Sequence, residues 1–145
     1  MNFTTKSRYA VNALADLEYF SNYESPVALK DIADRQGIDL TYLEQLFRKL
    51  RIAGIVKSVR GRNGGYIYAS HPQEISIKRI MDAVEENLDA TNCAGTSSCH
   101  SGQQCNSHKL WDDLNNVVDE FLSDISITDL VDKSKDPHIY LKEIK

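Results

Sequence analysis

Apolar residues recur every three or four positions along most of the chain, a period typical of helices with one buried face. Glycine directly follows two of these stretches, at Gly37 and Gly54, as it commonly does after the last turn of a helix. The capping-box pattern of Ser126 and Asp129 predicts one more short helix. The pattern therefore predicts helices over residues 5–20, 29–36, 40–53, 75–88 and 108–125, and the short helix after Ser126.

The helix predicted over residues 40–53 has two distinct faces. Its apolar face, which is expected to pack, consists of Leu43, Leu46, Phe47 and Leu50. Its opposite face consists of Thr41, Glu44, Gln45 and Arg48. An outward row of hydrogen-bonding side chains is what a helix in the major groove of DNA presents to the base edges.

Two β-prone runs, 55–59 and 66–69, follow this helix. Asn63-Gly64 between them is typical of a hairpin turn, because both residues tolerate positive φ. The order of helix, helix, glycine turn, helix and basic hairpin is that of a winged helix-turn-helix, whose second turn helix enters the major groove. Arg60 and Arg62 at the hairpin tip suit phosphate or a narrow minor groove.

Charge is distributed unevenly along the chain. Residues 1–80 carry twelve Lys/Arg against eight Asp/Glu, and residues 81–145 carry five against thirteen. Within residues 41–62, Glu44 is the one acidic residue, and the basic ones are Arg48, Lys49, Arg51, Lys57, Arg60 and Arg62. This basic block indicates a polyanion such as double-stranded DNA, although an ordinary solvated surface explains the charge equally well.

The helix predicted over residues 108–125 has a wide apolar face that needs cover. Its members are Leu110, Trp111, Leu114, Val117, Val118, Phe121, Leu122 and Ile125. Either the N-terminal domain or a partner subunit can cover this face. We favour a homodimer because DNA-binding proteins of this type commonly bind as two-fold dimers. We therefore expect a mostly α fold with a small β-hairpin wing. Its parts are a winged helix-turn-helix domain (1–72), a segment (73–131) with a loop (90–107) and a long C-terminal dimerisation helix, and a tail (132–145).

All three cysteines, Cys93, Cys99 and Cys105, fall within thirteen aperiodic residues. No apolar run is long enough for a membrane span and no apolar leader is present, so we expect a cytoplasmic protein. Clustered thiols in that reducing compartment indicate metal or redox chemistry. The Cys-x5-Cys-x5-Cys-x2-His spacing ends at His108. Its gaps are longer than the usual spacing in structural zinc sites and favour an iron–sulfur cluster.

Three cysteines leave an iron–sulfur cluster one ligand short. His108, His100, another subunit or an exogenous group can supply that ligand. We favour His108 because it begins the long helix, where a histidine is otherwise simply exposed to solvent. Structural zinc, a thiol switch and an electron carrier remain open interpretations. No Ser-His-Asp array or paired-carboxylate cleft is apparent, so we expect no enzyme.

Four stretches resemble the IscR-type iron–sulfur cluster regulators, a family of bacterial winged-helix repressors. They are SRYAV (7–11), DIADRQGIDLTYLEQLF (31–47), SVRGRNGGY (58–66) and LDATNCAG (88–95). The resemblance covers about residues 1–131, and the CNSHKLW end of the cysteine motif is its most specific part. It implies a homodimeric, DNA-binding transcription regulator that senses cluster status and controls cluster-assembly genes. By the same resemblance a 2Fe–2S cluster would be held by Cys93, Cys99, Cys105 and His108.

The resemblance also identifies DNA-reading positions: Thr41, Glu44 and Gln45 match base-reading residues, and Arg60 matches the wing arginine. Together with the surface pattern, this predicts DNA contacts from Thr41, Tyr42, Glu44, Gln45, Arg48, Arg60 and Arg62. The wing departs from the family's RGPGGGY, because Arg62-Asn63 replaces Pro-Gly. Glu44 also has a second interpretation, since Thr41-x-x-Glu44 has the spacing of a capping box.

Nitric-oxide-sensing repressors of the NsrR type are the nearest alternative. They carry three similarly spaced cysteines, usually around a 4Fe–4S cluster. In some of them an acidic residue near the N-terminus of the partner subunit is the fourth ligand. The matching position here is Arg8, which cannot bind iron, so the resemblance favours the IscR type with His108.

Overall fold

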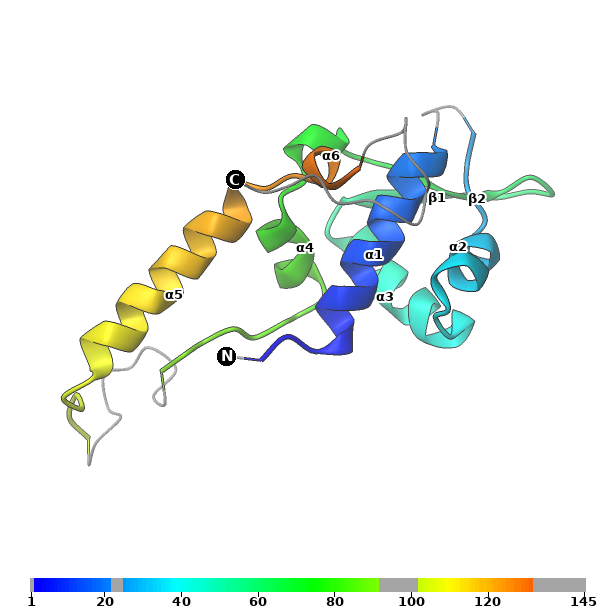
Figure 1. Ribbon diagram of the computed structural model, residues 1–145. Coiled ribbons are helices and arrows are strands. Elements are labelled where there is room, and N and C mark those ends of the chain that lie inside the picture. The colour runs from blue at the N-terminus through cyan, green and yellow to red at the C-terminus, as the bar shows by residue number, and fades with distance from the viewer. Residues whose placement is uncertain (1, 22–24, 92–101, 132–145) are drawn as a thin grey trace.

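The computed structural model describes residues 2–21, 25–91 and 102–131, so Cys93, Cys99, His100 and the tail 132–145 lie outside the described residues. The elements are α1 (Thr5–Phe20), α2 (Leu29–Gln36), α3 (Leu40–Ile52), β1 (Val56–Val59), β2 (Gly65–Tyr68), the 3-10 turn η1 (Pro72–Glu74), α4 (Ile77–Ala83), α5 (His108–Ser123) and α6 (Ile127–Leu130). This mostly helical arrangement with a two-stranded hairpin confirms the predicted fold class. In Figure 1, α1–α4, α6 and the hairpin form one body, from which α5 projects to the left.

Local capping defines the helix-turn-helix of α2 and α3. Gly37 ends α2 with a φ of 65°, in the left-handed region that glycine adopts without strain. α3 begins after Asp39, whose carboxylate accepts a hydrogen bond from the Tyr42 amide at 3.0 Å. Arg35 Nη2 lies 2.7 Å from Oδ1 of the fully buried Asp16, and this ion pair holds α2 on α1. These contacts fix which face of α3 is outward.

β1 and β2 form the predicted wing as an antiparallel hairpin. Val27, which precedes α2, extends the sheet through two backbone hydrogen bonds with Tyr66, of 3.0 and 2.9 Å. The basis of the turn differs from the prediction, because neither Asn63 nor Gly64 has a positive φ. The Gly64 amide instead donates to the Gly61 carbonyl at 3.0 Å, and a Cβ at residue 64 would lie 2.3 Å from a backbone oxygen of β1. Glycine is required at residue 64 because the β1 backbone lies too close for a Cβ, and not because the turn needs a positive φ.

α4 is shorter than the helix predicted over residues 75–88. Two backbone hydrogen bonds, of 2.8 and 3.0 Å, join residues 75–77 to residues 125–127, so the chain is extended before α4. After α4, Glu85 adopts a φ of 62°, which does not continue a helix. The pairing with residues 125–127 also ends α5 before Ile125.

One hydrophobic core joins α1, α3, α4 and α6. Leu14, Phe47, Ile80 and Ile127, one from each helix, are fully buried in it. The predicted capping box at Ser126 is present at the start of α6. This core lies behind the outward face of α3 and gives it rigid support.

Candidate nucleic-acid interface and metal-ligating residues

The polar face of α3 lies on the surface of the body. Thr41, Glu44, Gln45 and Arg48 are all exposed, whereas the apolar residues of the same helix are buried. Within the described part of the chain, none of these four side chains makes a hydrogen bond or an ion pair. The row is therefore available to an external partner over its whole length.

The structure distinguishes the two interpretations of Glu44. Asp39, not Thr41, is the N-cap of α3, and Thr41 lies within the first turn. The capping-box interpretation of Glu44 is therefore wrong. Its exposed carboxylate can accept a hydrogen bond from a donor outside the chain, such as the cytosine N4 amino group.

Tyr42 is only half-exposed, because it contacts α1. Its ring packs edge-on against Tyr9, with centroids 5.9 Å apart, and its hydroxyl lies 3.2 Å from the Thr5 hydroxyl. Tyr42 therefore holds the start of α3 against the start of α1, while its hydroxyl stays at the surface.

The wing, which consists of β1, β2 and the turn between them, adds exposed basic side chains to those on the polar face of α3. Arg60 and Arg62 are exposed in the turn between β1 and β2, and Lys57 is exposed on β1 itself. Lys57 was counted in the basic block, but the sequence pattern did not single it out as a DNA contact. Its outward position on β1 follows once the strand register is known.

Not every basic residue near α3 is free for a polyanion. Lys49 Nζ lies 2.9 Å from a carboxylate oxygen of Glu85. The hydrogen bond and the charge of Lys49 lower the pKa of Glu85, so this acid stays ionised and partly neutralises the lysine. Considering the described residues alone, the cations of this surface without an ion pair are Arg48, Arg51, Lys57, Arg60 and Arg62.

Two of the predicted ligand residues, Cys105 and His108, lie three positions apart at the start of α5. Cys105 is half-buried, and its carbonyl accepts a hydrogen bond from the His108 amide at 3.2 Å. The His108 side chain is buried, so the interpretation of a solvent-exposed histidine at the helix start is wrong. Within the described ranges no three His, Cys, Asp or Glu residues are grouped closely enough for a metal ion. A thiolate and an imidazole one turn apart are donors that suit zinc or an iron–sulfur cluster.

Sequence reasoning missed a polar contact on the same helix. Asn115 Nδ2 donates to Asp89 Oδ1 at 2.8 Å, and Asn115 Oδ1 accepts from the Ala90 amide at 2.8 Å. The Asp89-x-Thr91 pattern is a local turn signal, because an Asp side chain commonly binds the backbone two residues on. Nothing in that pattern pointed to α5, which lies beyond the cysteine loop.

The outer face of α5 has no cover within the described part of the chain. Leu110, Val117 and Phe121 are 60%, 63% and 52% exposed, and Trp111 and Leu114 are exposed beside them. The inner face is different, because Val118 and Leu122 pack against the core. The N-terminal body thus covers only the inner part of the predicted apolar face.

A groove of about 460 Å³ lies along α1 and touches the inner face of α5 at Leu122. α1, α4 and the start of the chain line it, and its apolar members include Phe3, Ile77, Met81 and Leu122.

Among the described residues, no helix has the length and hydrophobicity of a membrane span.

The sequence matches a known family over nearly its whole length. Residues 3–133 match the model of the Rrf2 family, described as iron-dependent transcriptional regulators. The HTH-type transcriptional regulator IscR of Pectobacterium atrosepticum is 46% identical over 135 residues, which are 93% of this chain and 82% of the relative. The regulator of the same name from Aliivibrio salmonicida is 48% identical over 131 residues, 90% of this chain and 77% of the relative.

Solved structures support the same fold. CymR, the global cysteine regulator of B. subtilis, matches with a TM-score of 0.78 and 31% identity, over 94% of this chain and 99% of that one. T. potens IscR matches with a TM-score of 0.70 and 37% identity, over 88% of this chain and 83% of that one. Both similarities extend over the winged helix-turn-helix body and beyond it.

Proposed function

Because this chain belongs to the Rrf2 family of transcriptional regulators, we propose that it is a homodimeric, DNA-binding sensor of iron–sulfur cluster status. In this proposal it holds a 2Fe–2S cluster, controls the genes of cluster assembly, acts in the cytoplasm and is not an enzyme. The observation that carries the proposal is the buried His108 beside Cys105 at the start of α5. A helix-anchored ligand of this kind links the occupancy of a cluster to the helix that would join two subunits.

The residues that would hold the cluster are Cys93, Cys99, Cys105 and His108. Three thiolates and one imidazole match the ligand chemistry of iron–sulfur centres in which nitrogen replaces one sulfur. A bound cluster would supply a chemical state that depends on iron, sulfide and oxidants. The protein's part is to fix the position of His108 at the start of α5.

The exposed outer face of α5 supports a homodimer. Fully burying an apolar side chain of this size contributes about 1.5–3 kcal/mol, and five such side chains lie on this one face. The apolar groove lined by Phe3, Ile77 and Met81 reaches the inner side of this helix at Leu122. A second copy of α5 is the partner whose chemistry matches both surfaces. A two-fold axis there would present two α3 helices to successive turns of the major groove.

On DNA, α3 would enter the major groove and the wing would follow the backbone or the minor groove. Thr41, Glu44 and Gln45 would contact base edges, with Glu44 accepting from cytosine. The remaining predicted contacts to DNA are those of Tyr42, Arg48, Arg60 and Arg62. With about six phosphate contacts, the affinity would fall about a thousandfold between 50 and 200 mM salt.

Anaerobic purification of the full chain, with visible absorption and iron and sulfide analysis, tests the proposal. We expect two irons and two sulfides per chain, DNA binding that changes when the cluster is removed, and an altered spectrum in His108→Ala. One zinc per chain without visible absorption would identify a structural zinc protein. Four irons per chain and release of DNA by nitric oxide would identify an NsrR-type sensor.

A further inference from the structure

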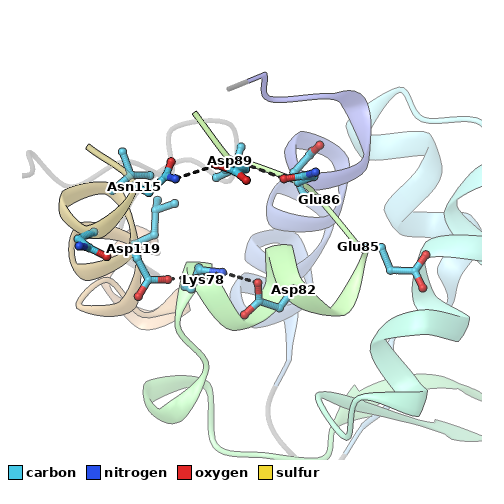
Figure 2. Close-up of a pocket in the computed structure, with 12 residues that line it drawn as sticks. Lys78, Asp82, Glu85, Glu86, Asp89, Asn115 and Asp119 are labelled. Carbon is cyan, nitrogen blue, oxygen red and sulfur yellow. Dashed lines mark hydrogen bonds and ion pairs between the residues drawn. The ribbon is translucent and has the colours of Figure 1, made fainter. Parts of the chain in front are cut away.

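A cleft of about 500 Å³ separates α4 and the following segment from α5 (Figure 2). Its lining is strongly acidic, yet each carboxylate already has a partner in the structure. Lys78 contacts Asp82 and Asp119, at 2.5 and 3.5 Å, and Glu85 pairs with Lys49. The other two acids, Glu86 and Asp89, accept hydrogen bonds from Thr4, Ser7, Thr91 and Asn115. The carboxylates of the cleft are therefore used within the chain, and two sets of contacts, Lys78 with Asp119 and Asn115 with residues 89 and 90, join the body to α5.

One of these two sets of contacts holds the segment that leads into the cysteines. Asp89 Oδ1 accepts three hydrogen bonds, from Asn115 Nδ2 at 2.8 Å, the Thr91 amide at 2.8 Å and the Thr91 hydroxyl at 2.7 Å. Asn115 returns a bond by accepting from the Ala90 amide at 2.8 Å. Both atoms of the Asn115 amide group are thus used on residues 89 and 90. We refer to this set of contacts as the Asp89–Asn115 clamp.

The clamp lies on the side of α5 that carries His108. Residues seven apart are two turns apart on a helix and share a face, so Asn115 and His108 lie in one row. Val118 and Leu122 continue this row to the core. Thr91, the last residue of the clamped segment, comes two positions before Cys93 in the sequence, and two residues reach at most about 7 Å. The position of residues 89–91 therefore limits where the first predicted cysteine ligand can lie.

We propose that Asp89 and Asn115 are positioning residues for the cluster, because they hold the segment before Cys93 on the His108 face of α5. This inference rests on the proposed function, in which Cys93 and His108 bind the same cluster. The clamp holds residues 89–91, which directly precede the cysteine loop, on the side of α5 that carries His108 before the cluster binds. Pre-organised ligands lose less conformational freedom on binding and so release the cluster more slowly.

A pair of charge substitutions one residue apart tests this role. Asn115→Asp places a carboxylate against Asp89 and removes the donor of the clamp. Asn116→Asp adds the same charge at an exposed neighbour that makes no hydrogen bond among the described residues. We expect an iron chelator to remove the cluster about tenfold faster from Asn115→Asp than from Asn116→Asp, which should match the unsubstituted chain. Combining Asp89→Asn with Asn115→Asp restores a donor opposite an acceptor and should recover part of the loss.

A second measurement separates positioning from plain stabilisation. Asn115→Ala, with Asn116→Ala as its control, removes the clamp without adding charge. Positioning predicts an altered visible circular dichroism of the cluster and faster hydrogen exchange at the Ala90 amide of the cluster-free protein. A merely structural role would lower the melting midpoint and leave the cluster spectrum unchanged.

The possible outcomes are distinct. If the unsubstituted chain binds no cluster, the proposed function fails and this role of the clamp fails with it. If that chain binds a cluster and both Asn115 variants release it at the rate of their Asn116 controls, the positioning role is wrong while the proposed function stands.

Discussion

Helices α3 and α5 carry apolar residues at similar spacing, but different parts of the molecule cover them. In α3 the apolar face, including Phe47 and Leu50, is buried against the other helices of the same chain. In α5 the outer face keeps Leu110 and Val117 more than half exposed. The body is therefore covered within one chain, whereas the outer face of α5 has no cover among the described residues, and in the proposed dimer a second copy buries it.

The two regions also differ in how their functional residues are held. The polar row of α3 is placed by one regular helix on a rigid core, so its members need no contacts of their own. In the proposed function the cluster ligands come from a loop and a helix start, and the Asp89–Asn115 clamp holds on α5 the segment that precedes this loop. In the proposed function, cluster sensing therefore depends on α5 and the cysteine loop, the region whose functional residues need additional side-chain contacts.

The largest expected effect comes from placing a charge on the outer face of α5. In the proposed dimer, Val117→Glu places a charge on the interface face of both subunits. Each subunit therefore loses apolar burial and gains a carboxylate that must be desolvated. We expect the dimer dissociation constant to rise about a thousandfold, with operator affinity falling as well. Analytical ultracentrifugation over a concentration series measures this. Asn116→Glu adds the same charge beside the apolar face and should leave the dimer intact. A Val117→Glu variant that still forms a tight dimer would show that this face is not the interface.

In α3, whose apolar face is buried within the chain, substitutions on the polar face should preserve the fold but change the DNA sequence preference. Glu44→Gln removes a carboxylate that accepts from cytosine N4 and repels phosphate. We expect the preference between operators with and without cytosine at the contacted position to change about tenfold, with little loss of overall affinity.

Arg60→Ala is the comparison for that experiment, because a phosphate contact carries no sequence information. It should weaken all operators alike and reduce the salt dependence by about one charge. Quantitative DNA-binding titrations at several salt concentrations separate the two patterns. Equal weakening of every operator by Glu44→Gln would contradict base reading by this residue.

The body was largely predictable from the sequence, because its determinants are local. The periodicity of α1 and α2 and the glycine after α2 define these helices at both ends. The helix predicted over residues 75–88 was wrong in extent, since its first residues pair with residues 125–127 and Glu85 adopts a positive φ. Both causes depend on tertiary contacts that periodicity does not contain.

The candidate site was predictable in its residue types but not in its supports. The cysteine spacing and the outward row of α3 are readable from the chain, and the burial of His108 gives the predicted histidine ligand a defined place. The contact of Asp89 with Asn115 joins residues on opposite sides of the cysteine loop. Asn115 lies among polar residues of an amphipathic helix, where nothing distinguishes it from its solvent-exposed neighbour Asn116.

The smallest predicted effect concerns Glu86, which joins the segment after α4 to the start of α1. Its carboxylate accepts hydrogen bonds from the Thr4 and Ser7 side chains, at 2.7 and 2.6 Å, and from both backbone amides at the start of α1. Burial alone would raise the pKa of Glu86, but the hydrogen bonds from Ser7 and Thr4 outweigh it and lower the pKa below its ordinary value of 4.5. A lowered pKa in the folded protein means that Glu86 stabilises the fold above about pH 4.5 and loses this contribution as the pH falls further.

Glu86→Gln should therefore cost about 1–2 kcal/mol of unfolding free energy at pH 7 and less below pH 4. Urea unfolding of the cluster-free protein at both pH values measures the difference. Glu85→Gln is the matched control, because Glu85 is exposed and pairs with Lys49 at the surface, where ion pairs contribute little. If the cost of Glu86→Gln is the same at both pH values, the carboxylate does not cap α1 in its ionised form. The protonated carboxyl would then hold the first turn of α1 as well as the carboxylate does.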